Sequence, residues 1–83
     1  MFVIYAIKSL TTNRIYIGYT QDLDKRLKYH NSGYVKSTAE DKPWEMIALE
    51  RIKYRNEARW KERLLKMSKG KRIKWIHHNR IKA

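Results

Sequence analysis

The types of five side chains in this sequence suit the hydrolysis of a phosphodiester: Tyr5, Tyr16, Arg26, His30 and Glu62. This reaction needs an activated water, neutralisation of the charge that builds up on the phosphate oxygens, and help for the leaving alkoxide. A guanidinium can grip a phosphate through two hydrogen bonds. One carboxylate is enough to hold a Mg²⁺-like ion, because that ion keeps several of its waters. The set therefore suits phosphodiester chemistry without a cluster of acidic residues.

The two tyrosines lie eleven residues apart, in two runs rich in β-branched and aromatic residues. Turn-forming residues 9–13 separate these runs, so we predict a β-hairpin with one phenol on each strand. A phenol has an unperturbed pKa of about 10 and accepts a proton from water only if nearby positive charge lowers that pKa. For Tyr5, Arg26, a bound cation and the net charge of +12 all act in this direction.

The second run of this hairpin contains a glycine, Gly18, two residues after Tyr16. Alternate residues of a strand point to the same face, so Tyr16 and Gly18 share one face. A glycine inside a strand often marks the close approach of a ligand or of another part of the chain. A simple strand bulge is the alternative. Whether Tyr5 lies on this same face depends on the register of the hairpin, which the sequence does not determine.

The pattern along the chain predicts elements in the order ββαβαα. Strands are expected at residues 2–8, 14–19 and 44–52, and helices at about 21–31 and 57–67, followed by a final basic helix. We expect Thr20 to cap the first helix and Gly33 to end it. Arg26 and His30, four residues apart, lie one above the other on this helix. Asn56 is the expected cap of the second helix.

The second helix is expected to carry a broad apolar stripe, made of Ala58, Trp60, Leu64, Leu65 and Met67. After a break at residues 68–70, the final helix is expected to carry Ile73, Trp75, Ile76 and Ile81. The tryptophans, Trp44 included, are expected in packed positions and not as stacking platforms for bases. Glu62 falls beside the apolar stripe, in a segment that is otherwise almost free of acidic residues.

The charge of the chain indicates a polyanionic partner, most often a nucleic acid. Twenty Lys and Arg residues stand against eight Asp and Glu residues, and residues 55–83 hold eleven of the cations but two carboxylates. The alternative is a solvated basic tail, but aromatic and aliphatic residues are threaded through this segment. Candidate contacts to nucleic acid are Lys25, Lys28, Lys66, Lys69, Lys71 and Arg72.

Length and composition predict one domain over residues 1–83, with a core at about 2–68 and a basic helix over 69–83. The chain has no cysteine, so it has neither disulfides nor thiolate metal sites. No apolar run approaches the length of a membrane span or of a signal peptide. We therefore expect a cytoplasmic protein with no membrane partner; the sequence leaves its protein partners and oligomeric state open.

Several short motifs together carry a resemblance to a known family. They are Val3-Ile4-Tyr5, Tyr16-Ile17-Gly18, the run Asp22 to Leu27, His30 to Gly33, Lys42 to Glu45, and Glu57-Ala58 with Lys61-Glu62. With these motifs, in order from residue 2 to about 68, the chain resembles the GIY-YIG nuclease domain, in particular its small stand-alone bacterial members. One departure is Val3, which stands where the family name has glycine.

The resemblance implies an α+β fold with a three-stranded antiparallel sheet flanked by helices. It also implies endonucleolytic hydrolysis of DNA, rather than RNA, with one divalent cation, Mg²⁺ or Mn²⁺. By the resemblance Tyr5 is the general base and Tyr16 lines the site. Arg26 would contact the scissile phosphate, His30 would assist in proton handling or phosphate contact, and Glu62 would hold the metal. Because the small members lack an appended specificity domain, we expect structure-type or weakly sequence-specific cleavage.

Other interpretations remain open for the chain and for its residues. It could be a basic nucleic-acid-binding module without catalysis, whose last two helices lie on a duplex, or a recruitment domain that docks on an acidic protein or ribosomal RNA. Tyr5 and Tyr16 could be half-buried strand aromatics, and Arg26 one more surface cation. His30 could only cap the C-terminal end of its helix. Glu62 could only pair with a lysine one turn further on.

Overall fold

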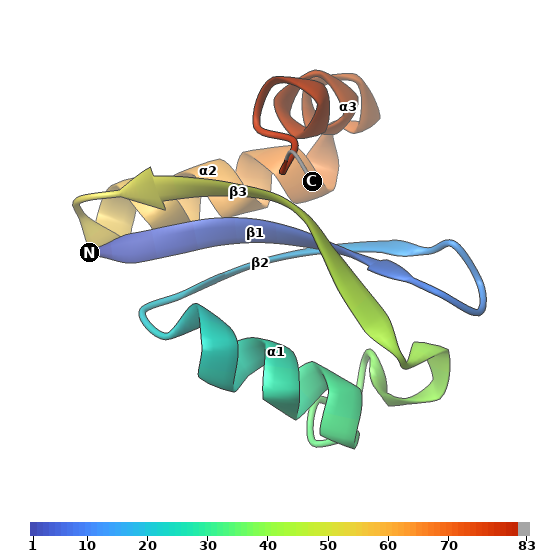
Figure 1. Cartoon of the computed structure of the whole chain (residues 1–83). Helices are drawn as coiled ribbons and strands as arrows, with labels where there is room; N and C mark the ends of the chain where they lie inside the picture. The colour runs from blue at the N-terminus through green and yellow to red at the C-terminus, as the bar shows by residue number, and fades with distance from the viewer. Residues whose placement is uncertain (82–83) are drawn as a thin grey trace.

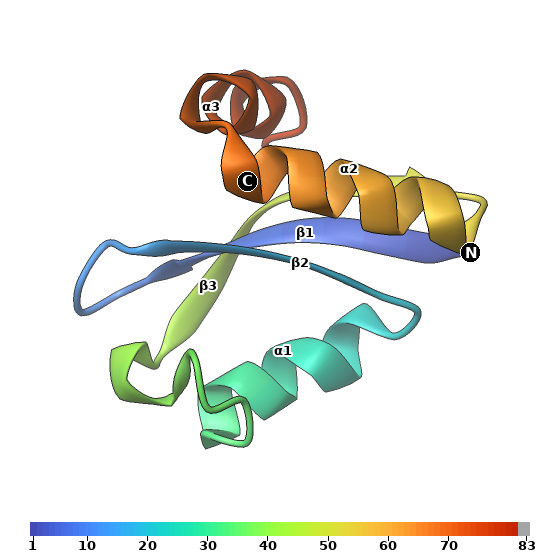
Figure 2. The ribbon, with the colours of Figure 1, turned by 180° about the vertical axis from the view of Figure 1, so that it is seen from behind.

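Three layers make up the computed structural model, which describes residues 1–81: a central sheet has one helix on one face and two on the other (Figures 1 and 2). The elements are β1 (Phe2–Ser9), β2 (Ile15–Thr20), α1 (Leu23–Ser32), a short 3₁₀ helix η1 (Ala39–Asp41), β3 (Trp44–Ile52), α2 (Arg55–Met67) and α3 (Lys69–His78). Helix α1 covers one face, and α2 and α3 cover the other. The predicted α+β class and the order ββαβαα are confirmed.

The sheet is antiparallel, as predicted, and its strand order is β2-β1-β3, so β1 is central and β2 is an edge strand. Its register answers the question that the sequence left open. Tyr5 pairs with Gly18 and Ile7 pairs with Tyr16. Residues that face each other across two strands point to the same side of the sheet, so both tyrosines and Gly18 lie on one face.

The alternation along β1 divides the interior into two cores. Ile4 and Ala6 face α2 and α3, where they pack with Ala58, Leu65, Trp75 and Ile76 among others. Tyr5 and Ile7 face α1 and pack with Trp44, Leu23 and Leu27. Burying each large apolar side chain stabilises the fold by about 1.5–3 kcal/mol. Tyr5 is thus both a core residue and a candidate for chemistry.

The cap predicted for the first helix is wrong by two residues. Thr20 still belongs to β2, and Asp22 is the N-cap of α1, where its carboxylate accepts a hydrogen bond of 3.1 Å from the Lys25 amide. The Thr20 hydroxyl accepts from the Asp22 amide instead, at 3.1 Å, and so supports the turn before the helix. Gly33 ends α1 as predicted, with a left-handed φ of 87° that favours glycine.

The cap predicted for the second helix is also wrong. Helix α2 begins at Arg55, directly after Tyr54, and no side chain caps it, because Asn56 already lies inside the first turn. The break between α2 and α3 is confirmed but is one residue long. Ser68 is extended, and its hydroxyl accepts from the Lys71 amide at 3.3 Å, which caps α3.

The basic helix expected over 69–83 ends at His78, and residues 82–83 lie outside the described part of the chain. Ile81, expected in this helix, follows it, and its amide donates to the carbonyl of Ile47 at 3.0 Å. Trp75 and Ile76 are buried as expected, whereas Ile73 is exposed. No helix within residues 1–81 is long and apolar enough to span a membrane.

The apolar stripe of α2 is narrower than predicted. Ala58 and Leu65, seven residues apart, face the sheet, and both are buried. Trp60 is 65% exposed and Met67 is 79% exposed, so the packed position predicted for each is wrong. Two residues beyond Ala58 is about 200° around a helix, which directs Trp60 away from the sheet. Trp44 and Trp75 are buried, as predicted.

Candidate active site

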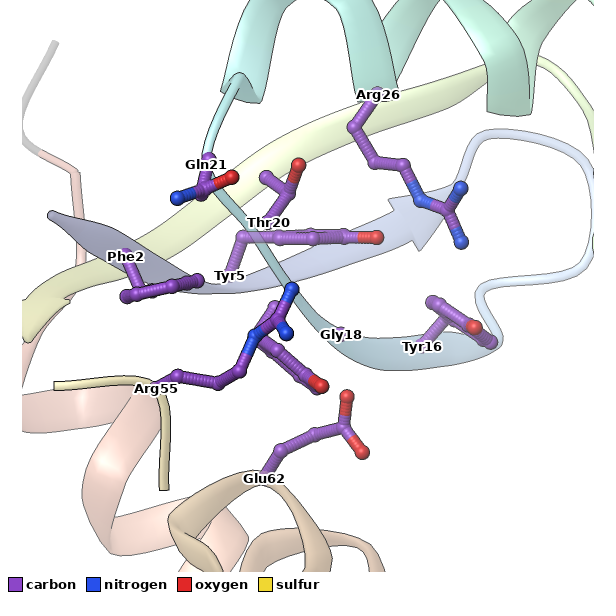
Figure 3. A pocket seen from close by; sticks show the side chains of 10 residues that line it. Phe2, Tyr5, Tyr16, Gly18, Thr20, Gln21, Arg26, Arg55 and Glu62 are labelled. Atoms are coloured by element: carbon purple, nitrogen blue, oxygen red, sulfur yellow. The ribbon is translucent and has the colours of Figure 1, made fainter. Parts of the chain in front are cut away.

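A cleft of about 370 Å³ lies at the β2 edge of the sheet, between the helix layers. Tyr5, Tyr16, Gly18, Arg26 and Glu62, all chosen from the sequence, line it (Figure 3). Arg26 reaches in from α1 and Glu62 from α2, on the two sides of the sheet, while the strands supply the tyrosines and the glycine. The cleft therefore unites side chains from four elements.

Gly18 is required by the position of the Tyr5 ring. A Cβ atom on Gly18 would lie 2.6 Å from Cζ of Tyr5 and closer still to its hydroxyl oxygen. This is far below van der Waals contact, and neither the central strand nor the buried ring has room to move. The close approach expected at this glycine is thus made by a tyrosine of the neighbouring strand. The bulge alternative is wrong, because Gly18 is regularly paired.

We expect Gly18→Ala to displace the Tyr5 ring. The free energy of unfolding should fall by about 1–3 kcal/mol, as for other overpacked sites. Denaturant titration measures this change. Gly70→Ala is the matched control, since a Cβ there meets no atom within 4 Å. Equal behaviour of the two variants would contradict the steric account.

His30 stands directly behind Tyr5 and is fully buried, so it is not an exposed cap of α1. Its Nε2 lies 2.8 Å from the Tyr5 hydroxyl, and its Nδ1 lies 2.8 Å from Oγ1 of Thr38. The Thr38 hydroxyl donates to the carbonyl of Val35, at 3.2 Å, so it accepts from His30 Nδ1–H. Nε2 of the neutral ring is then the acceptor. The Tyr5 hydroxyl therefore donates its proton to His30.

The loop after α1 holds this chain of hydrogen bonds in place. Trp44 donates its indole N–H to the carbonyl of Thr38, at 2.9 Å. The side-chain amide of Asn31 bonds both backbone polar groups of Trp44. The start of β3, the loop and the end of α1 are thereby tied together, which fixes the orientation of the His30 ring.

Burial, together with the positive charge of Arg26, lowers the pKa of His30 to about 4. Since the ordinary value is 6.5, His30 is neutral near pH 7. The unfolded chain takes up a proton at His30 as the pH falls through about 6.5, whereas the folded chain does so only near pH 4. Neutral His30 therefore contributes stability above pH 6.5, and that stability is lost as the pH falls towards 4.

We expect this effect to destabilise the fold by on the order of 3 kcal/mol between about pH 7 and about pH 4. Urea titrations of the wild type and of His30→Gln across this range measure it. Between these pH values the free energy of unfolding of His30→Gln should fall less than that of the wild type, by this amount, because glutamine does not titrate. Exposed His77→Gln is the control and should follow the wild type. Parallel curves for wild type and His30→Gln would contradict the prediction.

Burial also raises the pKa of Tyr5, to about 12, although Arg26 acts in the opposite direction. The lowering by positive charge that the sequence predicts is thus present for Arg26, but desolvation outweighs it. Tyr5 is accordingly a neutral phenol near pH 7, which agrees with its role as the donor to His30. Tyr5 can therefore accept a proton only if its own hydroxyl proton moves to another group at the same time.

Arg26 is half-buried at the end of the cleft, with its guanidinium turned towards Tyr5 and Tyr16 (Figure 3). The Tyr5 oxygen beside it raises the pKa of Arg26. Its Nε is buried without a hydrogen-bond partner, and within residues 1–81 no carboxylate pairs with it. A buried N–H of a cation costs free energy unless an acceptor satisfies it. The arrangement suits an anion in the cleft.

Oε1 of Glu62 lies 3.5 Å from Nζ of Lys66, one turn further along α2, so the ion pair considered as the alternative role of Glu62 is present. The Lys66 ammonium lies 5.2 Å from the centre of the Tyr16 ring, which keeps it beside the cleft. Such pairs contribute only about 0.2–0.5 kcal/mol. The Glu62 carboxylate nevertheless lines the cleft, and 18% of the side chain's surface is exposed.

A divalent ion fits this donor set only in one way. Within residues 1–81 no group of three or more His, Cys, Asp or Glu side chains could enclose a metal. Both ring nitrogens of His30 are already engaged, which leaves Glu62 as the carboxylate in the cleft. A hard cation that keeps most of its waters is compatible with one carboxylate and a substrate phosphate; an ion that needs a full protein cage is not.

The six basic residues expected to contact nucleic acid differ in their surroundings. Lys66 contacts the cleft through Tyr16, and Lys25 lies over the ring of Tyr29. Arg72 is half-buried and donates to the last carbonyls of α2, those of Leu65 and Lys66. Lys28, Lys69 and Lys71 are exposed. Contact with nucleic acid stays a prediction for all six.

The cleft also includes residues that the sequence did not single out: Phe2, Tyr19, Thr20, Gln21 and Arg55. Arg55 could have been found, because it lies seven residues before Glu62 and thus on the same face of α2. Thr38, whose hydroxyl accepts from His30 and so places the ring proton on Nδ1, could not have been found from sequence spacing. Its position depends on the path of a loop and on the packing of Trp44.

These observations agree with comparison to known proteins. The cleft at the sheet edge, lined by tyrosine, arginine and a single glutamate, lies within the part of the chain that a nuclease-family model matches. The family model of the GIY-YIG catalytic domain matches residues 1–74, so the chain belongs to the GIY-YIG family. The resemblance predicted from the motifs is confirmed. No curated protein and no solved structure matches the chain.

Proposed function

We propose that this protein is a divalent-metal-dependent endonuclease that hydrolyses phosphodiester bonds in DNA, with structure-type or weak sequence specificity. The observation that supports it most is the convergence of Tyr5, Arg26 and Glu62 on one cleft, with His30 hydrogen-bonded behind Tyr5. DNA as the substrate, in preference to RNA, and a cytoplasmic location are part of the same proposal.

In this proposal Arg26 binds the scissile phosphate. Its guanidinium neutralises charge on the phosphate oxygens. Glu62 would hold Mg²⁺ or Mn²⁺, which supplies further charge neutralisation and assists the leaving alkoxide. Tyr16 lines the wall between Arg26 and His30, its ring centre 5.0 Å from the centre of the imidazole, and restricts water around the phosphate.

Tyr5 and His30 act as one proton acceptor. As water attacks phosphorus, its proton moves to the Tyr5 oxygen, and the hydroxyl proton of Tyr5 moves to Nε2 of His30. His30 then carries the charge, with its Nδ1–H still donated to Thr38. Tyr5 remains a neutral phenol before and after the step. A phenol with a pKa of about 12 can therefore serve, because no free phenolate has to form.

The test is incubation of the purified protein with duplex, nicked, branched and single-stranded DNA, with Mg²⁺ or Mn²⁺ and with a chelator. We expect cleavage of at least one substrate with metal and none with chelator. If nothing is cut while DNA binding persists in chelator and weakens steeply with salt, the protein is a binding module without catalysis, and the proposal is wrong.

A further inference from the structure

A second groove, of about 750 Å³, runs along the exposed side of α2 and adjoins the catalytic cleft. Its lining consists of Tyr54, Arg55, Asn56, Arg59, Trp60, Glu62 and Arg63. Arg55 and Glu62 line both hollows, so a chain molecule bound at one can continue into the other. The proposed mechanism uses none of the other five residues.

Two large aromatic side chains of this groove face solvent. Trp60 is 65% exposed and Tyr54 is 57% exposed, although the same fold buries Trp44 and Trp75 almost completely. Contiguous exposed apolar surface rimmed by polar residues marks a ligand-binding groove, and these two rings line the same hollow. A flat ligand face could stack on either ring.

The charge of the groove is strongly positive. Arg55, Arg59 and Arg63 recur every four residues, which places them along one side of α2. Within residues 1–81 none of them forms an ion pair with a carboxylate. Glu62 is the one acidic residue among those that line the groove, and it lies beside Lys66. The ligand is thus expected to be an anion with flat, apolar faces.

We propose that this groove binds unpaired nucleotides of a DNA strand, next to the scissile phosphate. Bases stack on Trp60 and Tyr54, and Arg59 and Arg63 contact the phosphates between them. Bases inside a duplex cover each other's faces, so stacking on a protein ring requires unpaired bases. The inference rests on the proposed function for the position of the scissile phosphate. It makes the preferred substrate one with a single-stranded segment beside the cut.

Trp60 offers a direct test, because the other two tryptophans are buried. The purified protein is titrated in chelator with a short oligothymidylate and, separately, with a blunt duplex of equal length, and tryptophan emission is recorded. We expect the single strand to quench emission in the wild type and not in Trp60→Phe. Trp60→Ala should weaken single-strand binding roughly 5- to 100-fold, as measured by anisotropy, and change duplex binding by less than about twofold.

Met67→Ala is the matched control, as the removal of another exposed apolar side chain from the same helix, and should bind as the wild type does. The inference is overturned if the single strand does not quench Trp60, or if Trp60→Ala weakens both ligands equally. It is also overturned if sedimentation shows a dimer that Trp60→Ala dissociates, since a second copy then occupies the groove. Because binding is measured in chelator, a protein that cuts no DNA would disprove the proposed catalysis but leave the binding result valid. If the protein cuts DNA and neither binding nor cleavage depends on Trp60, the groove inference alone is wrong.

Discussion

Replacing Glu62 by glutamine is expected to reduce cleavage at least about 100-fold, with the fold intact. Glutamine keeps the shape of the side chain but removes the charge that would hold the divalent ion, and loss of one such electrostatic element typically costs about 10²–10³ in rate. Among the residues that line the cleft, Glu62 carries the one carboxylate. The measurement is the single-turnover cleavage rate over a range of Mg²⁺ concentrations.

The matched control for this change is Glu57→Gln, which removes an exposed carboxylate from the same helix. It should cut like the wild type. Because Glu62 contributes only a weak pair with Lys66, the free energy of unfolding of Glu62→Gln should change by less than about 0.5 kcal/mol. A Glu62→Gln protein that cuts within about threefold of the wild-type rate would remove Glu62 from the mechanism.

Replacing Tyr5 by phenylalanine is expected to lower the cleavage rate by roughly 10²–10⁴-fold, the usual contribution of a positioned acid or base. The ring stays packed over Gly18, so the cleft keeps its shape, but the proton can no longer pass to His30. The buried Nε2 of His30 also loses its donor, which should cost about 1–3 kcal/mol of stability. Cleavage is therefore assayed well below the unfolding midpoint of the variant.

Two comparisons separate chemistry from stability in this prediction. Tyr34→Phe removes a hydroxyl from a tyrosine that is 81% exposed, and it should alter neither quantity. Tyr5→Phe combined with His30→Gln should be no slower than the slower single variant, because residues that act as one unit are not additive. Losses that multiply would show that the two side chains act separately.

The sequence predicted the order of elements and most of their bounds, because local patterns decide these. The third strand agrees at both ends with Trp44–Ile52, and Gly33 has the left-handed φ that its type suggested. The caps at Thr20 and Asn56 were wrong, because both positions depend on where a strand or a loop ends. The prediction that Trp60 is packed was also wrong, because the burial of this side chain depends on which side of α2 faces the sheet.

The candidate site was predictable as a set of residue types but not as an arrangement. Tyr5, Arg26 and Glu62 could be chosen because their motifs recur in a known family. Their convergence depends on the register that pairs Tyr5 with Gly18, and no local pattern determines that register. The net rise in the pKa of Tyr5 could not be predicted either, because charge is visible in a sequence whereas desolvation depends on tertiary packing.

The contact between the Tyr5 ring and Gly18 makes the two tyrosine-containing triplets a single steric unit. The large ring of Tyr5 fits because Gly18 has no side chain, and any side chain at position 18 would collide with that ring. A chain that replaced Tyr5 by a small residue would leave a void that a side chain at position 18 could fill. Relatives that have given up the phenol are therefore expected to have lost this glycine as well. The pair can be read together, from sequence alone, as a marker of whether such a domain still has this phenol.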